Sequence, residues 1–426
     1  MASSDFKVLI LGGGNCGLSL ATGLKKAGIN YTVFERDSEH DFFHRPRDWG
    51  ILLHWGAEYL EKVLPPHLRA RIKEPRCDPH LDTLAGIPPV PYVNALTVDF
   101  CYCERKGPNS ADRIQFGKYL DKVSVNGDTV QVTFRDGTTE TGNMAIGCDG
   151  SHSKVREFLV GHDAAQLEPV DLTMINFPKG GYTAEEARLL QTLHPVFKIA
   201  AHPDKPGNGI LGGTNHIHSS STSAETLLIM ASTVALDIAD PNDPTTWKFQ
   251  NYVGWWGPPY AKDLQDPETR MNVYRSWVSS FCEPFRTGGL KLAEGEVVPV
   301  YPGQQWAPTM AWDNYGGKVT LAGDAAHSMV PQRGQGLNNA IKDASDIVDA
   351  IKTVTSGEKT LEEAIAAYEA EMKPRGAKEV ALSLEQALKA RNQSTLKDSP
   401  LFKLGWQRGK AEAPAPTPAH AENVQT

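Results

Sequence analysis

The segment GDAAHSMVPQRGQGLNNAIKDA, residues 323–344, combines residue types that are unusual at the start of a helix. An aspartate, a proline and closely spaced glycines follow the apolar run 318–322 and precede residues with helical periodicity. This order predicts a strand, a glycine turn and a helix N-terminus, whose backbone N–H groups point toward a negatively charged group. The segment is therefore a candidate anion-binding element.

A second glycine turn lies near the N-terminus, in VLILGGGNCGLSLATGLKKAGINYTVFER. Gly12, Gly14 and Gly17 fit GxGxxG between a predicted strand and helix, and Glu35 closes the next strand. In this pattern the first glycine permits a tight turn, the second lets a pyrophosphate approach, the third lets helix pack on strand, and the acid binds an adenosine ribose. The same spelling at 207–212 lacks a flanking strand and helix, which predicts a loop there.

The elements around these motifs can be predicted from hydrophobic patterning. Residues 7–37 are expected to form a βαβ unit, and residues 122–150, with an Asn-Gly-Asp turn, a hairpin meander. The pattern is helical over 334–372; Pro374 is expected to end that helix, and 376–391 to form another.

Between these parts, 86–103 and 165–290 carry short alternating, aromatic-rich segments broken by Pro and Gly. They predict a mixed or antiparallel sheet. Trp255 and Trp256 are weak candidates for stacking on a planar substrate, because aromatic clusters more often belong to a core.

Composition narrows the class of protein. The chain has 426 residues, 40% hydrophobic and 22% charged, as is typical of a globular enzyme of two or three domains. The net charge of −8 and the lack of a basic stripe argue against a nucleic-acid partner. No signal-like N-terminus, membrane-length apolar run or paired cysteine motif is present, which predicts a cytoplasmic protein without stable membrane insertion or a bound metal.

A third motif, IGCDGSHSKVR at 146–156, completes a set. The three motifs in this order resemble the class A FAD-dependent monooxygenases, the p-hydroxybenzoate hydroxylase and salicylate hydroxylase group, and most of all its fungal members. The resemblance covers residues 5–375, and GDAAHxxxPxxGQGxNxxxxDA is its most specific part.

The resemblance implies an α/β fold with a discontinuous Rossmann-like FAD-binding domain, an inserted mixed β-sheet substrate domain and C-terminal helices. The expected boundaries are 1–75, 104–164 and 291–372 for the FAD-binding domain, 76–103 and 165–290 for the substrate domain, 373–410 for the C-terminal helices and 411–426 for a disordered tail.

The resemblance also implies roles for matching residues. Asp324 would bind the ribityl chain of FAD, and Pro331 would lie over the flavin ring, where oxygen and substrate meet. The helix opening would point its amides at the flavin N1 and C2 carbonyl, where the reduced ring carries negative charge. The flavin contacts implied in this segment are Gly323, Asp324, Pro331, Gly334, Gly336, Leu337 and Asn338.

In the IGCDG motif, Asp149 would contact the cofactor and take part in nicotinamide binding; the alternative is a structural ion pair with Arg156. An arginine in HRPRDWGILLHW would lie near the FAD pyrophosphate, because its planar fork suits a phosphate. Arg47 is favoured there over Arg45. No second well-placed dinucleotide motif is present, which fits a transient NADPH or NADH donor.

The implied reaction is oxygen transfer from a flavin C4a-hydroperoxide to an aromatic or secondary-metabolite substrate, by hydroxylation or epoxidation. Baeyer–Villiger insertion is the alternative. The family's arginine-rich helix is missing from 101–125, so a flavin-binding protein with impaired catalysis is a further alternative, with Arg105 or Arg113 as possible replacements. The WxWxIP signature of flavin halogenases is absent.

Overall fold

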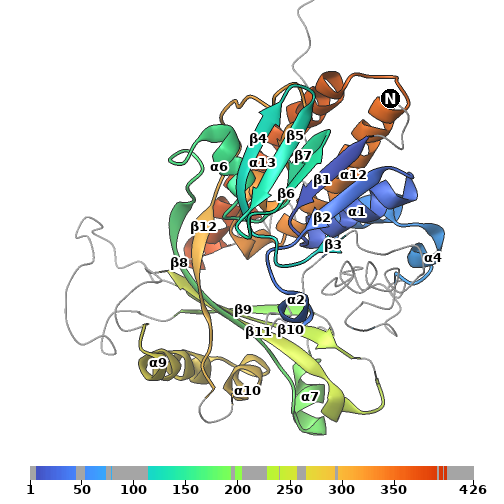
Figure 1. Cartoon of the computed structure of the whole chain (residues 1–426). Coiled ribbons are helices and arrows are strands. Elements are labelled where there is room, and N and C mark those ends of the chain that lie inside the picture. Colours follow the sequence, from blue (N-terminus) through green and yellow to red (C-terminus); the bar gives the residue numbers. More distant parts are fainter. Residues whose placement is uncertain are drawn as a thin grey trace, which may run out of the picture.

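The computed structural model describes residues 6–44, 53–72, 78, 114–192, 197–203, 228–238, 240–256, 265–292, 296–390, 393–396 and 398–400. Within these residues the strands form two five-stranded sheets and one three-stranded sheet, with helices packed against them (Figure 1). Of the first expected substrate-domain segment, 76–103, the structure describes residue 78 alone.

A parallel sheet carries the three sequence motifs. Its strand order is β13-β7-β1-β2-β3. The strands are β1 (Lys7–Leu11), β2 (Asn30–Phe34), β3 (Ile114–Gln115), β7 (Met144–Gly147) and β13 (Val319–Leu321). Leu11 is in register with Phe34 and Gly147, and Leu321 with Gly147, so these strands end together. All three motifs therefore begin at one edge, where α/β sheets bind ligands.

Three helices pack against one another beside this sheet. These are α1 (Asn15–Lys26), α3 (Gly56–Val63) and α12 (Gly336–Thr355). A Cβ at Gly23 of α1 would lie 2.6 Å from Val348 Cγ2 and 3.2 Å from Val63 Cβ. The first and last motifs of the chain are thus joined through packed helices.

The region 120–160 adds the predicted meander. β4 (Leu120–Asn126), β5 (Thr129–Phe134) and β6 (Thr139–Gly142) form an antiparallel sheet, followed by β7 and by α6 (Lys154–Val160). The βαβ unit and the meander were both predicted correctly, because each follows from local alternation and turn residues.

The second large sheet is antiparallel, with the order β12-β8-β11-β10-β9. Its strands are β8 (Glu168–Lys179), β9 (Phe197–Pro203), β10 (Leu228–Asp237), β11 (Lys248–Trp256) and β12 (Val300–Gln305). The helices α7 (Ala184–Leu190), α9 (Pro267–Ser280) and α10 (Phe285–Leu290) lie on the side away from the parallel sheet (Figure 1).

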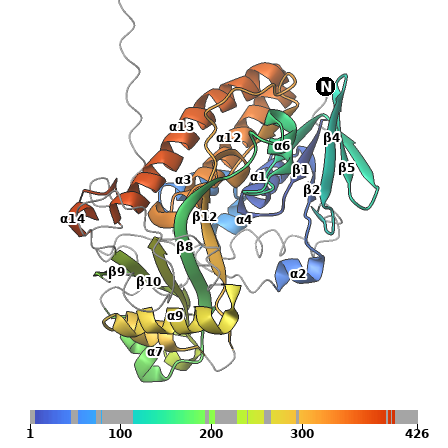
Figure 2. The same ribbon diagram turned by 90° about the vertical axis from the view of Figure 1, so that its left-hand side faces the viewer.

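The predicted break at Pro374 is wrong. Helix α13 runs from Leu361 to Ala390 through this proline, and it lies alongside α12 (Figure 2). The break falls instead after Thr355, where Gly357 has φ +79° and Thr360 and Glu363 form a capping box. Helix residues before and after Pro374 are buried in the protein. This packing offsets the helical hydrogen bond that proline cannot donate.

The remaining elements are short: α2 (Glu39–Phe43), α4 (Pro66–Arg69), η1 (Pro244–Thr246), α11 (Asp324–His327), η2 (Pro331–Arg333) and α14 (Gln393–Leu396). Among the helices of the described ranges, none combines the length and apolar character needed to cross a bilayer.

Candidate functional site

The carboxyl ends of β1, β2 and β7 surround a cavity of about 190 Å³. Its wall includes Gly12, Gly14, Glu35 and Asp149, which come from two of the three motifs. The structure therefore brings together residues that lie up to 137 positions apart and that were singled out for dinucleotide binding.

The three glycines of GxGxxG differ in what requires them. A Cβ at Gly12, whose φ is +113°, would lie 2.2 Å from the Cys148 carbonyl oxygen. One at Gly17 would lie 2.0 Å from the Gly12 carbonyl oxygen. A Cβ at Gly14 would meet no described atom within 4 Å beyond its chain neighbours. The fold needs Gly12 and Gly17, whereas the space at Gly14 is open for a ligand.

Glu35 is buried at the end of β2 and organises this turn. Its Oε2 accepts a hydrogen bond from Gly13 N at 2.8 Å, and its Oε1 accepts one from Asp37 N at 3.0 Å. The carboxylate thus holds the glycine turn and lies on the cavity wall. Contact with a ribose remains a prediction.

The two carboxylate oxygens of Asp149 differ in their hydrogen bonding. Its Oδ2 accepts hydrogen bonds from Lys154 N at 2.7 Å and Val155 N at 3.2 Å, at the start of α6. Oδ1 is buried and has no partner among the described residues. Burial raises the pKa of this carboxyl, although the Ser153 hydroxyl and the helix amides act to lower it. An unfilled buried acceptor beside a cavity is suited to a hydrogen-bond donor from a ligand.

Arg156 does not make the alternative ion pair with Asp149. Its buried guanidinium donates to the carbonyl oxygens of Ser151, of Ala165 at 3.1 Å and of Ala325 at 3.1 Å. Burial lowers the pKa of Arg156 to about 10. One side chain therefore ties the second motif to the third.

The third motif turns at Gly323, directly against the first. Gly323 has φ +63°, and a Cβ there would lie 3.1 Å from the Cβ of Cys16. The next residue, Asp324, is exposed, and a Cβ at Gly336 would lie 3.8 Å from its Oδ1. Asp324, which is predicted to bind the ribityl chain of FAD, therefore lies beside the opening of α12.

The opening of α12 has the features of an anion-binding helix end. The N-cap residue Gln335 makes no side-chain cap, so the first-turn N–H groups keep their hydrogen-bonding capacity. Gly334 is left-handed, with φ +61°, and ends η2; Pro331, at the start of η2, is exposed. Leu337 is instead buried in the core, so its predicted contact with FAD involves at most its backbone.

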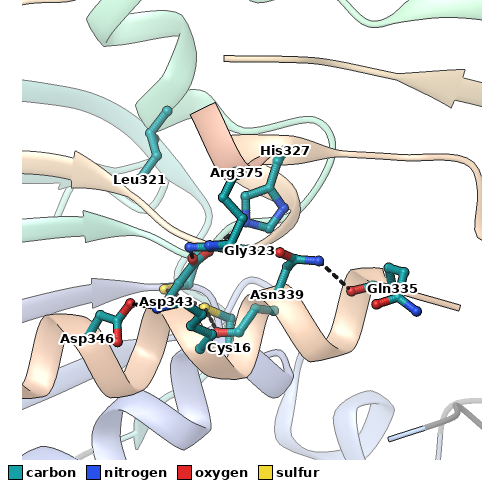
Figure 3. Close-up of polar contacts among 12 residues, drawn as sticks. Cys16, Leu321, Gly323, His327, Gln335, Asn339, Asp343, Asp346 and Arg375 are labelled. Carbon is teal, nitrogen blue, oxygen red and sulfur yellow. Dashed lines mark hydrogen bonds and ion pairs between the residues drawn. The ribbon is translucent and has the colours of Figure 1, made fainter. Parts of the chain in front are cut away.

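A buried ionic cluster supports this turn (Figure 3). Asp343 Oδ2 accepts from Gly323 N at 2.8 Å and lies 2.6 Å from His327 Nε2, while Asp343 Oδ1 lies 2.6 Å from Arg375 Nη2. Burial alone would raise the pKa of Asp343, but His327, Arg375 and the Gly323 amide together lower it to about 2. Asp343 therefore fixes the turn that carries Asp324.

Arg375 was not predicted from the sequence as a residue of the site. The available signal was weak: Glu371 and Arg375 stand four residues apart, and Arg375 precedes a glycine. In the structure a Cβ at Gly376 would lie 3.0 Å from His327 Cβ, so the glycine makes room for the imidazole.

The side chain of Asn338 forms hydrogen bonds with two separate backbone segments of the protein. Its Oδ1 accepts from His54 N at 2.7 Å and Gly56 N at 3.1 Å, and its Nδ2 donates to the Gly334 carbonyl at 3.0 Å. Asn338 thus joins the start of α3 to the left-handed turn before α12.

Asn338→Ala is expected to lower the free energy of unfolding by about 1–3 kcal/mol, because it leaves buried backbone groups without partners. Urea unfolding of the protein without added FAD measures this loss. Thr353→Ala, further along α12, is the control and should change stability by less than about 0.5 kcal/mol. Equal stability of the two variants would contradict the assignment.

The two predicted tryptophans are not brought together. Trp255 is 7% exposed, its ring 4.3 Å from that of Trp277 in the core under α9, while Trp256 belongs to the cluster on the other face of the sheet. The two rings therefore do not share a ligand surface. Predictions for Arg45, Arg47, Arg105 and Arg113 and for the 207–212 loop and the 411–426 tail fall outside the described residues.

Comparison with known proteins gives consistent matches. The model of an FAD binding domain matches residues 304–383. The FAD-dependent monooxygenase cctM of Talaromyces islandicus is 34% identical over 94% of this chain and 96% of the relative. The FAD-dependent monooxygenase phnB of Penicillium herquei is 31% identical over 95% and 96%.

Two solved structures have the same fold. HpxO of Klebsiella pneumoniae, crystallised with FAD and uric acid, aligns with a TM-score of 0.65 at 18% identity, covering 94% of this chain and 92% of that one. A putative FAD-containing monooxygenase of Photorhabdus luminescens aligns with a TM-score of 0.66 at 20% identity, covering 91% and 99%.

Proposed function

The chain belongs to the FAD-dependent monooxygenases, and from this premise we propose that it uses NADPH or NADH and O2 to hydroxylate or epoxidise an aromatic or secondary-metabolite substrate. We assign the parallel-sheet part to FAD binding and the antiparallel sheet to substrate binding. The domain boundaries are those expected from the sequence, except that β12, which lies within the expected FAD-binding segment 291–372, belongs to the antiparallel sheet.

The observation that carries the proposal is the fit of the residues to FAD. Gly14 leaves open space, Asp149 has an unpartnered buried oxygen, and the uncapped start of α12 lies beside Asp324. These features suit, respectively, a close diphosphate, a donating ligand group and a flavin ring that becomes negative on reduction. An ordinary packed turn would need none of them.

FAD, when bound, would supply the redox chemistry that links the nicotinamide donor to O2. The protein's own contribution is to bind and orient. Gly12, Gly14 and Gly17 would form the turn that faces the diphosphate, and Glu35 and Asp149, which line the cavity, would contact the cofactor there. The amides opening α12 would stabilise negative charge on the ring, and the exposed Pro331 would face the approaching substrate.

Purified protein is expected to be yellow, with about one FAD per chain, and to oxidise NADPH or NADH faster when a suitable aromatic compound is added. Product mass after reaction under ¹⁸O2 tests oxygen transfer, and the gain should be one labelled atom. A lactone or ester product would favour Baeyer–Villiger insertion. Bound FAD that neither nicotinamide can reduce would overturn the proposal in favour of a flavin-binding protein.

A further inference from the structure

The antiparallel sheet has one face directed at the predicted flavin site. Strand alternation puts Ile175 and Val253 toward α9, and their neighbours on the opposite face. On that face Met174 packs in a cluster with Val330, Leu384 and Ala387, which come from the segment before η2 and from α13. Substrate held on this face would therefore lie next to Pro331.

Gln332, Tyr252 and Asn176 are among the polar side chains on this face, which also carries Tyr301. Gln332, the residue after Pro331, donates from Nε2 to the hydroxyl of Tyr252 at 3.1 Å. Tyr252 is directly opposite Asn176 in the strand register, so their side chains share the face.

Two oxygens of this group lack partners. Gln332 Oε1 and Asn176 Oδ1 are both buried without a hydrogen bond in the described part of the chain, and Asn176 is only 8% exposed. Leaving a buried acceptor without a hydrogen bond costs about 1–3 kcal/mol. A ligand that donates a hydrogen bond to this acceptor would remove that cost. Even if either amide is turned over, one of its ends remains available to a ligand.

The backbone is shaped to keep the Tyr252 hydroxyl in this place. A Cβ at Gly254 would lie 2.2 Å from that hydroxyl oxygen, so only glycine leaves room for it. Burial raises the pKa of Tyr252, which keeps the phenol neutral. Arg333, the charged residue nearest in sequence to Gln332, is buried and already paired with Glu379 at 2.6 Å.

We infer that Tyr252, Gln332 and Asn176 bind the hydroxyl group of a neutral hydroxylated aromatic substrate and position its ring beside Pro331. This inference rests on the proposed monooxygenase function. The polar groups are neutral donors and acceptors within apolar surroundings, which suits a phenol. A carboxylate would need a compensating cation, because burying an unpaired charge is far more costly than burying a hydroxyl.

The test uses the FAD-loaded protein and a panel of neutral phenols of one to three rings, including 2-naphthol, with 2-naphthoate as the charged counterpart. The shift of the flavin spectrum on titration gives Kd without any turnover. We expect phenols to bind and 2-naphthoate to bind at least tenfold more weakly.

Tyr252→Phe and Gln332→Leu should each raise Kd and KM for the best phenol by roughly tenfold, the effect of one lost hydrogen bond of about 1.4 kcal/mol, with a smaller change in kcat. Tyr182→Phe is the matched control. It removes a buried hydroxyl that donates to the Gly288 carbonyl and accepts from Asn251. Asn251 precedes Tyr252 in the strand, so its side chain lies on the opposite face of the sheet. Tyr182→Phe should therefore leave Kd unchanged.

The inference is overturned if both site variants bind phenols as the wild type does, if no phenol of the panel binds, or if 2-naphthoate binds more tightly than 2-naphthol. Failure of the proposed function would look different. In that case the wild type would bind phenols but fail to transfer oxygen to any of them in the presence of NADPH or NADH.

Discussion

Gly17→Ala is expected to yield protein without FAD. The new Cβ would lie 2.0 Å from the Gly12 carbonyl oxygen, and 3.2 Å from Ile10 Cγ2, so the turn between β1 and α1 must open. Because backbone cannot move away as a flexible side chain can, the amides that face the diphosphate would be displaced. We expect FAD retention below a tenth of wild type, measured as flavin absorbance per chain, and a lower unfolding midpoint.

Gly14→Ala separates binding from folding at the same turn. Since no described atom beyond the chain neighbours lies within 4 Å of the new Cβ, the midpoint without FAD should stay near that of the wild type. FAD affinity should nevertheless fall by roughly tenfold or more, as expected for losing about 1.5–3 kcal/mol of charge-assisted hydrogen bonding. Wild-type affinity in this variant would show that no diphosphate approaches Gly14.

Asp343→Asn is expected to lower the free energy of unfolding by about 3–5 kcal/mol, because it removes the buried counter-charge of the Arg375 guanidinium and leaves only the pair with the more exposed Glu371. Denaturant unfolding measures the loss. Asp349→Asn, on the same helix, removes an exposed pair with Lys352 and should cost at most about 1 kcal/mol. Similar losses in the two variants would contradict a special role for Asp343.

The pH dependence provides a second readout of the same cluster. The pKa of Asp343 is lowered to about 2 in the folded protein, against about 3.9 in an unfolded chain. Its stabilising contribution is therefore complete above about pH 4 and is lost as the pH falls toward 2. In Asp343→Asn, the dependence of stability on pH in this window should be shallower than in the wild type.

The parts of the fold that could be predicted from sequence are those encoded locally. The βαβ unit, the meander and the strand before Gly323 each follow from alternation and glycine turns within about 30 residues. Their convergence at one sheet edge was also predictable, because parallel strands present their carboxyl ends together.

What could not be predicted depends on contacts between distant residues. Arg156 bonds carbonyls rather than Asp149, and Arg375 reaches Asp343 across 32 positions. Pro374 stays helical because tertiary packing outweighs a missing hydrogen bond. The paired tryptophans separate because neighbouring residues of a strand face opposite ways.

The three carbonyl contacts of Arg156 bear on the order of assembly during synthesis. One of them joins residues 169 positions apart, so it forms only after the ribosome has released the chain beyond Ala325. Contacts of such separation form late because loop closure must come first. A nascent chain that stops short of this alanine would already contain the sequence of its N-terminal βαβ unit. It would still lack the contact that joins the second and third motifs around the site for the vitamin-derived cofactor.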